Sequence, residues 1–305
     1  MQHTQSPDLK EPRHGTKLFP LAAYKTCFAS KGTMVRHHWH DEIEIIYFFE
    51  GDFRLEINME SYPVRSECLY FINPGELHSI VIEKDNSSAE EAIVFSPDLL
   101  SFECYDDIQV QLIQPVQNGT LLFPRCLLPE HPAFFPIRNA FSEIMNLCAK
   151  PFPRQTPSDD ITSQLYVKSG LLRILALLSD HRLFLKSKTS CDKRVEEIKK
   201  IITYIMEHYQ EKIYIHNLAE LVSMNEQYFC RFFKKAIGRS PMSYINDYRI
   251  KQSVRLLKET DLPVMEICLE CGFNNLGNFL KEFRKYTNTT PLRYRKNISS
   301  SNTEL

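Results

Sequence analysis

The last third of the chain repeats itself at a spacing of about fifty residues. The stretch EQYFCRFFKKAIGRSP starts at residue 226 and LGNFLKEFRKYTNTTP at residue 276, so Phe229 and Phe233 fall on Phe279 and Phe283. The segments before them align better at an offset of 49. A repeat of this size is one supersecondary unit, and the change of offset predicts one extra residue in a turn of the second copy.

Each copy has the pattern of a short helix, a tight turn and a longer helix. The short helices, in IHNLAELV and PVMEICLEC, place a small residue, Ala219 or Cys268, where two helices must cross closely. The turns contain Ser223 and Gly272, and glycine accepts positive φ without strain. This pattern predicts two helix-turn-helix units, in which the second helix enters the major groove of DNA.

The aromatic residues of the longer helices determine which side chains face outward. With the phenylalanines buried, each helix keeps a polar, cationic face; Asn and Gln suit adenine edges, and Arg and Lys suit guanine edges or phosphate. A merely solvated face is the alternative, but two copies on a basic domain favour DNA binding. The side chains predicted to face outward are Gln227, Arg231 and Lys234 in the first copy and Asn275, Asn278, Lys281 and Arg284 or Lys285 in the second. Lys235, Arg284 and Lys285 are all predicted to contact DNA, Lys235 at phosphate.

The charge distribution is consistent with a nucleic-acid partner. The whole chain carries 37 Lys+Arg and 38 Asp+Glu, a net charge of −1. Residues 193–297 hold 19 of the basic and 12 of the acidic residues, a net charge of +7, which leaves −8 on the rest. A basic domain attracts the phosphate backbone, although a surface that compensates an acidic neighbour would show the same balance.

A further helix is predicted between the two units, from Ser240-Pro241 to Lys258. Serine is a favoured N-cap and proline a favoured first residue of a helix. Thr290-Pro291 restarts the chain in the same way after the second unit. If the linking helix is rigid, the two reading helices would enter successive major grooves about 34 Å apart on one face of DNA.

Residues 193–297 resemble the DNA-binding domain of the AraC/XylS family of bacterial transcription regulators. The matching stretches are LAELVSMNEQYFCRFFKKAIGRSPMSYINDYRIKQSVRLL and ICLECGFNNLGNFLKEFRKYTNTTPLRYR. The resemblance implies two helix-turn-helix units joined by a helix. It also implies DNA contacts from Asn225, Gln227, Cys230 and Arg231 in the first unit and from Leu276, Asn278 and Lys281 in the second.

Two positions depart from the usual family pattern. Gly277-Asn278 stands where the family usually has Ser-Tyr, and Cys268 where it usually has Ala. An interior glycine costs a helix about 1 kcal/mol, so we expect a looser second reading helix with less defined base specificity. Cys268 and Cys271 form a CxxC, but structural zinc requires four ligands, so we predict that both thiols are packing residues.

The N-terminal part is predicted to form a separate β domain, since 305 residues exceed the usual size of one domain. Residues 1–20 lack hydrophobic periodicity and are expected to be a frayed end. From 20 to 130, short apolar runs bounded by Asn, Pro, Gly or Ser predict the strands of a sandwich or barrel. IEIIYFFEGDFRLEI, from residue 43, predicts two strands joined by a hairpin-like turn at residues 50–52.

Helical segments are expected at 131–185, followed by a polar linker at 186–192 and the DNA-binding domain at 193–297. The first helix is predicted at 133–150 and the second at about 157–183, with Thr156 as N-cap and Pro157 in the first turn. The apolar stripe of the second helix is wider than one docking surface needs, so this helix either pairs two subunits or docks onto the barrel. The stripe contains Ile161, Leu165, Lys168, Leu172, Leu175 and Leu178, widened by Leu171, Ile174 and Leu177.

The first domain also contains a group of metal-ligand residue types. GTMVRHHWHDEIEIIYFFEG spells G-x5-H-x-H-x3-E-x6-G with His38, His40 and Glu44, and NPGELHS adds His78. In a strand, residues of equal parity share a face, so these four side chains can point together into a barrel. Three imidazoles and a carboxylate suit a divalent transition metal.

This pattern is similar to the first cupin motif in full and to the second in part, because Glu67 and Asn73 replace its first glycine and its proline. The AraC/XylS resemblance implies a cupin-like sensory barrel that binds a sugar or another small effector without a metal. We therefore rank an effector pocket at the three histidines and Glu44 first, structural histidines second and a metal site third. No cofactor and no catalytic residue is predicted.

The cellular location is predicted from what the sequence contains. No apolar run approaches the roughly 20 residues of a membrane helix, and the first residues lack the apolar core of a signal peptide. The nine cysteines are scattered, as expected of free thiols in a reducing cytosol. A cytoplasmic protein without a membrane partner is the prediction.

Together these features predict an α+β multidomain fold, with an N-terminal cupin-like β-barrel, a helical dimerisation segment and a C-terminal all-α double helix-turn-helix domain. The expected function is a homodimeric transcription activator, not an enzyme, controlled by a sugar-like molecule in the barrel. Its expected partners are double-stranded promoter DNA, the effector and RNA polymerase. The alternatives are a metal-dependent cupin enzyme with a helical appendage and a regulator whose barrel serves only for dimerisation.

Overall fold

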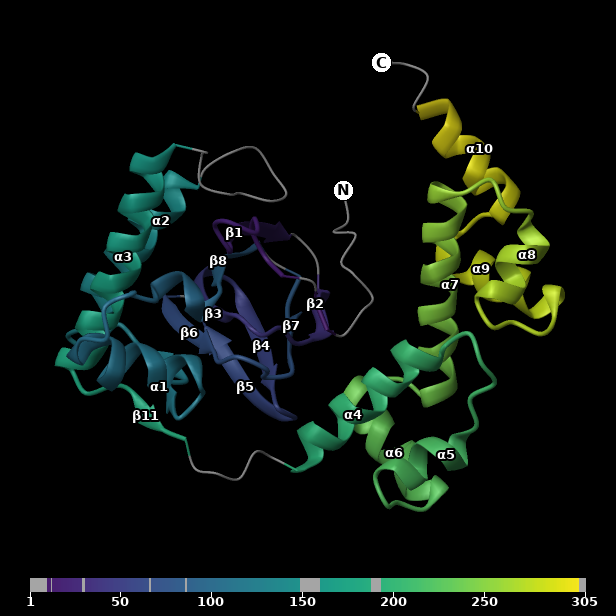
Figure 1. Ribbon diagram of the computed structural model, residues 1–305, viewed down its shortest axis with the longest axis horizontal. Coiled ribbons are helices and arrows are strands. Elements are labelled where there is room, and N and C mark those ends of the chain that lie inside the picture. Colours follow the sequence, from purple (N-terminus) through teal and green to yellow (C-terminus); the bar gives the residue numbers. More distant parts are fainter. Residues whose placement is uncertain are drawn as a thin grey trace. The chain divides into compact units, whose positions relative to one another are not determined.

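The computed structural model describes residues 10–11, 13–28, 31–65, 67–85, 87–148, 160–187 and 193–301. The chain divides between residues 191 and 192 into two compact units (Figure 1), and each is described by itself. The first unit contains β-sheets with helices beside them, and the second is helical in its described residues. The α+β multidomain fold predicted from the sequence is confirmed.

The first unit is built on two antiparallel sheets. The five-stranded sheet has the order β1-β8-β3-β6-β10, and the four-stranded sheet has the order β2-β7-β4-β5. In chain order the strands are β1 (Leu21–Phe28), β2 (Gly32–His38), β3 (Ile43–Glu50), β4 (Asp52–Ile57), β5 (Glu60–Arg65), β6 (Cys68–Ile72), β7 (His78–Ile82), β8 (Ser88–Phe95) and β10 (Cys126–Leu127).

Alternation along β3 separates two hydrophobic cores. Ile46 and Phe48 belong to the core between the sheets, whereas Ile45 and Tyr47 belong to the core beneath the outer helices. Since side chains of equal parity share a face of a strand, Glu44 faces the same interior as Ile46. The strand is buried on both faces, which explains its nearly continuous apolar sequence.

The predicted hairpin at residues 50–52 is wrong, although both strands exist. β3 pairs with β6 and β8, and β4 pairs with β5 and β7, so the chain crosses here from one sheet to the other. Gly51 has φ 113°, and a Cβ at this position would lie 2.4 Å from Oγ of Ser88. Glycine is required at this crossing both for its backbone conformation and for its lack of a side chain.

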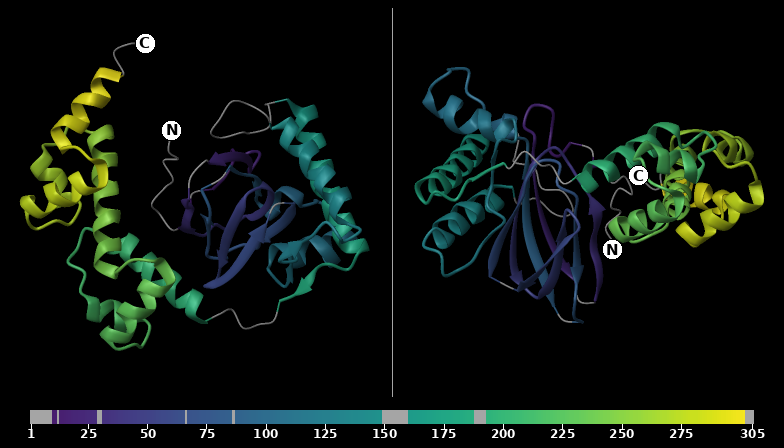
Figure 2. Two further views of the ribbon diagram at one scale, coloured as in Figure 1. Left: turned by 180° about the vertical axis from the view of Figure 1, so that it is seen from behind. Right: turned by 90° about the horizontal axis from the view of Figure 1, so that it is seen from below.

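Helices cover the outer face of the five-stranded sheet (Figure 2). Two of them, α2 (Phe134–Leu147) and α3 (Ile161–Asp180), pack closely together, and the lack of a side chain at Gly170 permits this. A Cβ at Gly170 would lie only 2.8 Å from Cγ1 of Ile144. The remaining elements of this unit are a 3-10 turn (Pro97–Leu100), a π-helix (Gln109–Ile113), α1 (Gln114–Gln117), and the paired short strands β9 (Leu121–Leu122) and β11 (Leu185–Lys186).

The start of α3 differs from the prediction. The expected cap at Thr156 and Pro157 lies outside the described residues, as do residues 188–192 of the expected linker. The side chain of Asp160 is the N-cap and accepts hydrogen bonds from the backbone N–H groups of Thr162 and Ser163. An aspartate at this position also interacts favourably with the positive end of the helix dipole.

The buried face of α3 also differs from the predicted stripe. Leu171, Ile174 and Leu178 are buried in the core of the first unit, whereas Ile161 and Leu165 are 73% and 62% exposed. Contrary to expectation, the 20-residue α3 is long and apolar enough, by length and composition, to cross a membrane. Its apolar character is explained in part by its contacts with α2 and the sheet.

The segment before β1 is not the frayed end that was predicted, as far as its described residues extend. Lys10 forms a parallel bridge with Trp39, and the backbone N–H of Glu11 donates to the carbonyl of Trp39 at 2.9 Å. His14 and Phe19 are 4% and 5% exposed. This part of the segment is therefore packed against the sheet beside the histidines of β2.

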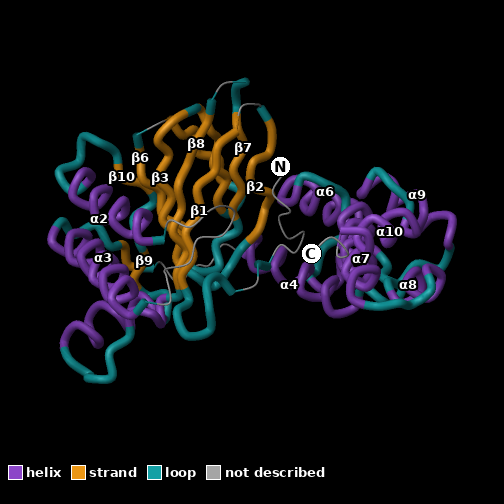
Figure 3. Tube along the Cα trace, turned by 90° about the horizontal axis from the view of Figure 1, so that it is seen from above, coloured by secondary structure: helices purple, strands orange, loops and turns teal. Residues whose placement is uncertain are grey.

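The second unit contains the predicted pair of helix-turn-helix units (Figure 3). Its helices are α4 (Lys193–His208), α5 (Ile215–Leu221), α6 (Glu226–Ile237), α7 (Pro241–Glu259), α8 (Val264–Glu270), α9 (Leu276–Thr287) and α10 (Pro291–Ser301). Helices α5 and α8 have 7 residues each, and α6 and α9 have 12 each. The short helices are offset by 49 and the long helices by 50, which confirms the extra residue in the second turn.

The packing of the two helix-turn-helix units also matches the prediction. The side chains of Phe229, Phe233, Phe279 and Phe283 are all 0% exposed, and the small residues Ala219 and Cys268 are 1% and 0% exposed. Cys268 and Cys271 lie in the core of the second unit, and burial raises the pKa of the Cys271 thiol to about 12. Both thiols are therefore packing residues.

Candidate DNA interface and ligand cluster

The two reading helices, α6 and α9, begin and end in equivalent ways. Asn225 and Asn275 are the N-caps, and their side chains accept hydrogen bonds from the backbone N–H groups of Tyr228 and Asn278. Gly238 and Asn288 end the helices in the left-handed conformation, which glycine and asparagine adopt most readily. The second helix-turn-helix unit thus repeats the first helix-turn-helix unit in its capping as well as in its core.

The predicted outward faces are exposed. Arg231 and Lys234 share one side of α6, and Asn278 and Lys281 share one side of α9. Cys230 is only half-buried, and Leu276 is 37% exposed. The exposed residues of the predicted set are Asn225, Gln227, Arg231, Lys234, Lys235, Asn275, Leu276, Asn278, Lys281, Arg284 and Lys285.

Capping limits what Asn225 and Asn275 can offer to a base. The Oδ1 atoms accept at 2.9 Å and 3.0 Å, so each side chain keeps only its NH2 group as a free donor. Reading adenine with an asparagine requires both the oxygen and the nitrogen of the amide. Sequence reasoning assigned these two residues to DNA and missed their role at the helix start, although Asn is a common N-cap.

Most of the outward cations are available for phosphate. Among the described residues, Arg231, Lys234, Lys235, Lys281 and Arg284 form no ion pair, whereas Nζ of Lys285 lies 3.6 Å from Oε2 of Glu282. Unpaired cations on one face attract a polyanion most strongly. The three cations of the first reading helix are therefore not held in ion pairs within the described residues.

Gly277 does not lie in the interior of α9. It is the second residue after the N-cap, and a Cβ there would lie 3.0 Å from Oδ1 of Asn275. The cost of an interior glycine therefore does not apply in full, because the first turn has fewer hydrogen bonds to lose. The expected loosening of the second reading helix is not supported.

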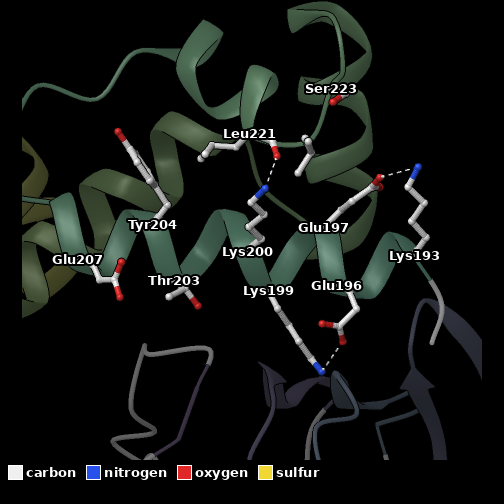
Figure 4. A pocket seen from close by; sticks show the side chains of 11 residues that line it. Lys193, Glu196, Glu197, Lys199, Lys200, Thr203, Tyr204, Glu207, Leu221 and Ser223 are labelled. Carbon is white, nitrogen blue, oxygen red and sulfur yellow. Dashed lines mark hydrogen bonds and ion pairs between the residues drawn. The ribbon is translucent and has the colours of Figure 1, made fainter. Parts of the chain in front are cut away.

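A groove runs along α4 beside the first helix-turn-helix unit (Figure 4). Nζ of Lys200 donates a hydrogen bond of 2.8 Å to the carbonyl of Leu221, the last residue of α5. Lys199 pairs with Glu196 at 3.1 Å on the same helix. Because a cation near a helix C-terminus satisfies the last carbonyls, α4 supports the end of α5.

Arg249 joins elements that the sequence pattern did not connect. It is 8% exposed, and its Nε and Nη2 donate to the backbone carbonyls of Tyr209 and Glu211 at 2.7 Å and 2.6 Å. Its guanidinium lies 5.8 Å from the ring centroid of Phe273, which is in the turn of the second helix-turn-helix unit. The linking helix α7 is thereby held to the segment after α4 and to the second helix-turn-helix unit.

The first unit brings together all four residues predicted for its pocket. The ligand atoms of His38, His40, Glu44 and His78 lie within 4.8 Å of one another, and all four side chains are buried. β2 and β7 supply His38 and His78 as a directly paired couple, β3 supplies Glu44, and His40 follows β2. The parity argument therefore placed these side chains correctly.

In each of the three histidines of the cluster, the ring nitrogen Nδ1 faces a backbone carbonyl. Nδ1 of His38 lies 2.9 Å from the oxygen of Arg36, Nδ1 of His40 lies 3.1 Å from that of Glu42, and Nδ1 of His78 lies 2.8 Å from that of Glu76. A carbonyl can only accept, so each Nδ1 carries the hydrogen. The three Nε2 atoms are then directed to the common centre of the cluster.

Glu44 lies at this centre. Its Oε2 is 3.0 Å from Nε2 of His78 and 3.3 Å from Nε2 of His40. Burial opposes its ionisation, but the imidazoles of His40 and His78 beside it outweigh burial and hold the pKa of Glu44 well below its usual range. Burial lowers the pKa of His38 to about 3, with the neighbouring His78 adding to the shift.

Sequence reasoning missed two residues beside the cluster. Oε2 of Glu11 lies 3.2 Å from Nε2 of His14 and 4.0 Å from Nε2 of His38. Burial opposes ionisation of Glu11, but the hydrogen bond with His14 is the largest of the effects that lower its pKa to about 2. The signal available in the sequence was the pair of titratable residues in EPRH, within a segment without hydrophobic periodicity.

A second buried carboxyl lies away from the cluster. Glu90 on β8 is 3% exposed, and its Oε2 has no hydrogen-bond partner among the described residues. Burial raises the pKa of Glu90 to about 8, and the charge of Glu44 adds to this effect. The pKa values of the buried Glu44 and Glu90 are therefore shifted in opposite directions.

Two family models match the chain, one in each unit. The model described as AraC-like ligand binding domain matches residues 21–144, and the model described as Helix-turn-helix domain matches residues 218–297. The first match contains the histidine cluster and every strand of the five-stranded and four-stranded sheets. The second contains both reading helices.

Several relatives match over most of their own length. The Bacillus subtilis protein named "Uncharacterized HTH-type transcriptional regulator YdeC" is 29% identical, over 95% of this chain and 96% of the relative. The Melibiose operon regulatory protein of Escherichia coli is 23% identical, over 88% and 86%. The HTH-type transcriptional activator RhaS of Escherichia coli is 20% identical, over 83% and 85%.

The matches to these relatives therefore extend over both the β-sheet unit and the double helix-turn-helix domain of this chain. The chain belongs to the AraC family of DNA-binding transcription regulators with an N-terminal ligand-binding domain.

Proposed function

We propose that this regulator activates transcription by placing α6 and α9 in neighbouring major grooves of one promoter site. The observation that carries the proposal is the equivalence of the two helices, which have the same length, caps and exposed polar face. Arg249 supports a fixed spacing, because it holds α7 to the segment after α4 and to the second turn. Activation is inferred from the relative that is named a transcriptional activator.

The proposed contacts divide between bases and phosphates. Gln227, Arg231, Asn278 and Lys281 lie on the exposed faces of α6 and α9, where side chains can reach base edges. Lys234, Lys235, Arg284 and Lys285 lie further towards the helix C-termini and suit phosphate. Asn225 and Asn275 contribute chiefly by fixing the helix starts.

We further propose that the barrel binds a small effector at the cluster of His38, His40, Glu44 and His78. A sugar is the first class to test, because one relative is named for the melibiose operon and because imidazole and carboxylate groups bind hydroxyls well. The effector changes DNA binding only if it binds two arrangements of the protein with different affinity. In this proposal the barrel is a sensor and not an enzyme.

Two copies of the chain are proposed to pair through α3. Ile161, Leu165 and Tyr166 are 73%, 62% and 64% exposed, and they form an apolar surface at the start of this helix. Exposed apolar surface of this kind marks interaction sites. The location is the cytoplasm, where RNA polymerase would be the partner at the promoter.

The DNA part is tested by a gel-shift assay of the full chain on the DNA upstream of its own and neighbouring genes. We expect one saturable complex that Arg231→Ala and Lys281→Ala each weaken. Arg173→Ala, in the first unit, is the matched loss of one exposed cation and should leave affinity unchanged. Equal weakening by all three variants would show that net charge alone, rather than the reading faces, drives binding.

The effector part is tested by thermal shift of the full chain against a panel of sugars. A ligand that binds only the native state raises the melting temperature. We expect a shift for at least one sugar, and its loss in the Glu44→Gln variant. A panel without any shift would count against a sugar effector while leaving the DNA result untouched.

A further inference from the structure

We propose that the cluster of His38, His40, Glu44 and His78 binds a divalent first-row transition-metal ion, with Glu11 as a fifth ligand. This metal ion would be the first ligand of the cluster. It depends on the proposed function only because the cluster is treated there as the sensory site. It reverses the ranking drawn from the sequence, in which a metal came third.

The ring hydrogens of the three histidines are positioned as they are in metal-binding histidines. Each histidine directs Nδ1 to a backbone carbonyl, at 2.8 to 3.1 Å, and so keeps its hydrogen on that atom. In a neutral ring, Nε2 is then a lone pair without a hydrogen. Metal-binding histidines nearly always donate their other N–H in this way, and here all three do.

The carboxylate of Glu44 adds a further acceptor beside the Nε2 atoms. Oε2 of Glu44 lies 3.0 Å from Nε2 of His78 and 3.3 Å from Nε2 of His40, and it too can only accept. Lone pairs therefore converge on one buried point without a hydrogen to share. A cation at this point turns the repulsion among these atoms into attraction.

Protonation of the imidazoles, instead of a metal ion, is the other way to place positive charge at the centre of the cluster. The ring centroids of His38 and His78 are 4.1 Å apart, and those of His40 and His78 are 5.1 Å apart. Two or three imidazolium ions at such distances in a buried site would repel each other and lose their hydration. One metal ion supplies the charge without this mutual repulsion.

The dimensions of the cluster suit one ion. Ligands placed 2.0–2.2 Å from a metal lie about 3 to 4.4 Å from one another, and the ligand atoms here lie within 4.8 Å. Inward movements of a few tenths of an ångström would complete the geometry. The set has imidazole nitrogen and carboxylate oxygen without thiolate, which favours Mn, Fe, Co, Ni or Zn over Ca or Cu(I).

Glu11 completes the set from a different part of the chain. Its backbone N–H donates to the carbonyl of Trp39, between two of the histidine ligands, so its position is fixed by the sheet. Its carboxylate is 19% exposed and lies 4.0 Å from Nε2 of His38. Glu11 and Glu44 together balance the two positive charges of the ion.

A site with these ligands also serves the proposed sensory role. Glu11, Glu44 and the three histidines would hold the ion, and a bound ion would supply a Lewis-acid centre. An effector with hydroxyl or carboxylate oxygens could be recognised through that centre. The metal would then be the resident part of the site, and the effector the exchangeable part.

The test uses the full chain, purified without a metal-affinity tag and stripped with a chelator. Titration with Co2+ should give visible d–d bands that saturate at one ion per chain, and calorimetry with Zn2+ should give the same stoichiometry. Glu44→Gln and His78→Ala should each weaken Co2+ binding by more than about 100-fold, and Glu11→Gln by about tenfold.

His37→Ala is the matched control, because its ring is next to His38 in sequence but bonds to Glu56 at 2.9 Å instead. It should bind Co2+ as the wild type does. Circular dichroism in chelator checks that each variant folds. If His78→Ala and Glu44→Gln both fail to fold, X-ray absorption of the wild-type Co2+ complex decides, and it must show imidazole ligands.

Two results would overturn the proposal. One is a wild-type protein without saturable Co2+ or Zn2+ binding; the other is equal affinity in the wild type and a folded Glu44→Gln variant. Unchanged affinity in Glu11→Gln would remove that residue from the ligand set. Because metal binding is measured without DNA, its failure is separate from any failure of promoter binding.

Discussion

Nε of Arg249 in the linking helix lies 2.7 Å from the backbone carbonyl oxygen of Tyr209. The same guanidinium donates to the carbonyl of Glu211, and a Cβ at Gly272 would lie 2.4 Å from the oxygen of Tyr209. The short segment after α4 is therefore in contact with both α7 and the second turn. This contact gives a physical basis for two reading helices with a fixed separation.

Arg249→Ala should lower the free energy of unfolding of the second unit by about 2–4 kcal/mol, because two backbone carbonyls would lose charged donors from a buried guanidinium. Arg255→Ala removes an exposed arginine of the same helix, which pairs weakly with Glu259 at 3.8 Å. That variant should change stability by less than about 0.5 kcal/mol. Urea unfolding followed by circular dichroism measures both, and equal effects would contradict the role assigned to Arg249.

Gly272→Ala should destabilise the protein more than Gly238→Ala. Both glycines have φ of 78°, a conformation that costs alanine about 1–2 kcal/mol. Gly238 has open space around its Cα, whereas an alanine at Gly272 would also meet the carbonyls of Tyr209 and Gln210. Thermal melts of the two variants give the comparison, and a larger loss at Gly238 would argue against close packing of the second turn.

Asn275→Asp separates capping from DNA binding. Aspartate accepts the same hydrogen bond from the N–H of Asn278 and caps as well as asparagine does, so stability should stay within about 0.5 kcal/mol of the wild type. Its negative charge should weaken DNA binding, because the start of α9 is proposed to lie in the groove of a polyanion. Asn275→Ala should instead cost about 1 kcal/mol of stability. A melting curve and a gel shift for each variant distinguish the two roles.

Glu90→Gln should alter the pH dependence of stability. The pKa of Glu90 is raised from 4.5 to about 8 by burial. Between these values the folded protein keeps a proton that the unfolded chain releases, so stability from this group is complete below the unfolded pKa and is lost as the pH rises through the folded pKa. The variant should gain stability over the wild type towards about pH 9 and little below about pH 4.5. Melting curves that stay parallel across this range would contradict a neutral buried Glu90.

The sequence predicts most where local periodicity and spacing carry the information. The change of offset from 50 to 49 located the extra turn residue, and the burial of Phe229 and Phe279 followed from helical spacing. Parity along β2 and β3 brought His38 and Glu44 together. These relations depend on neighbours in the chain, which a single sequence contains.

The sequence predicts least where distant segments decide the outcome. The turn at Gly51 looked like a hairpin, but strand pairing is set by partners tens of residues away, at β6, β7 and β8. Glu11 lies in a segment without periodicity, so its contact with His38 could not be inferred. Arg249 is a charged residue whose burial depends on carbonyls some forty residues earlier.

Selection from random duplex DNA with the full chain tests the central claim, that α6 and α9 read neighbouring turns of one site. The account predicts an enriched sequence with two conserved blocks about 10 base pairs apart. Arg231→Ala should relax preference in one block at a cost of about 1–3 kcal/mol, and Lys281→Ala should affect only the other block. Selection without any enriched sequence, or one block altered equally by both variants, would contradict it.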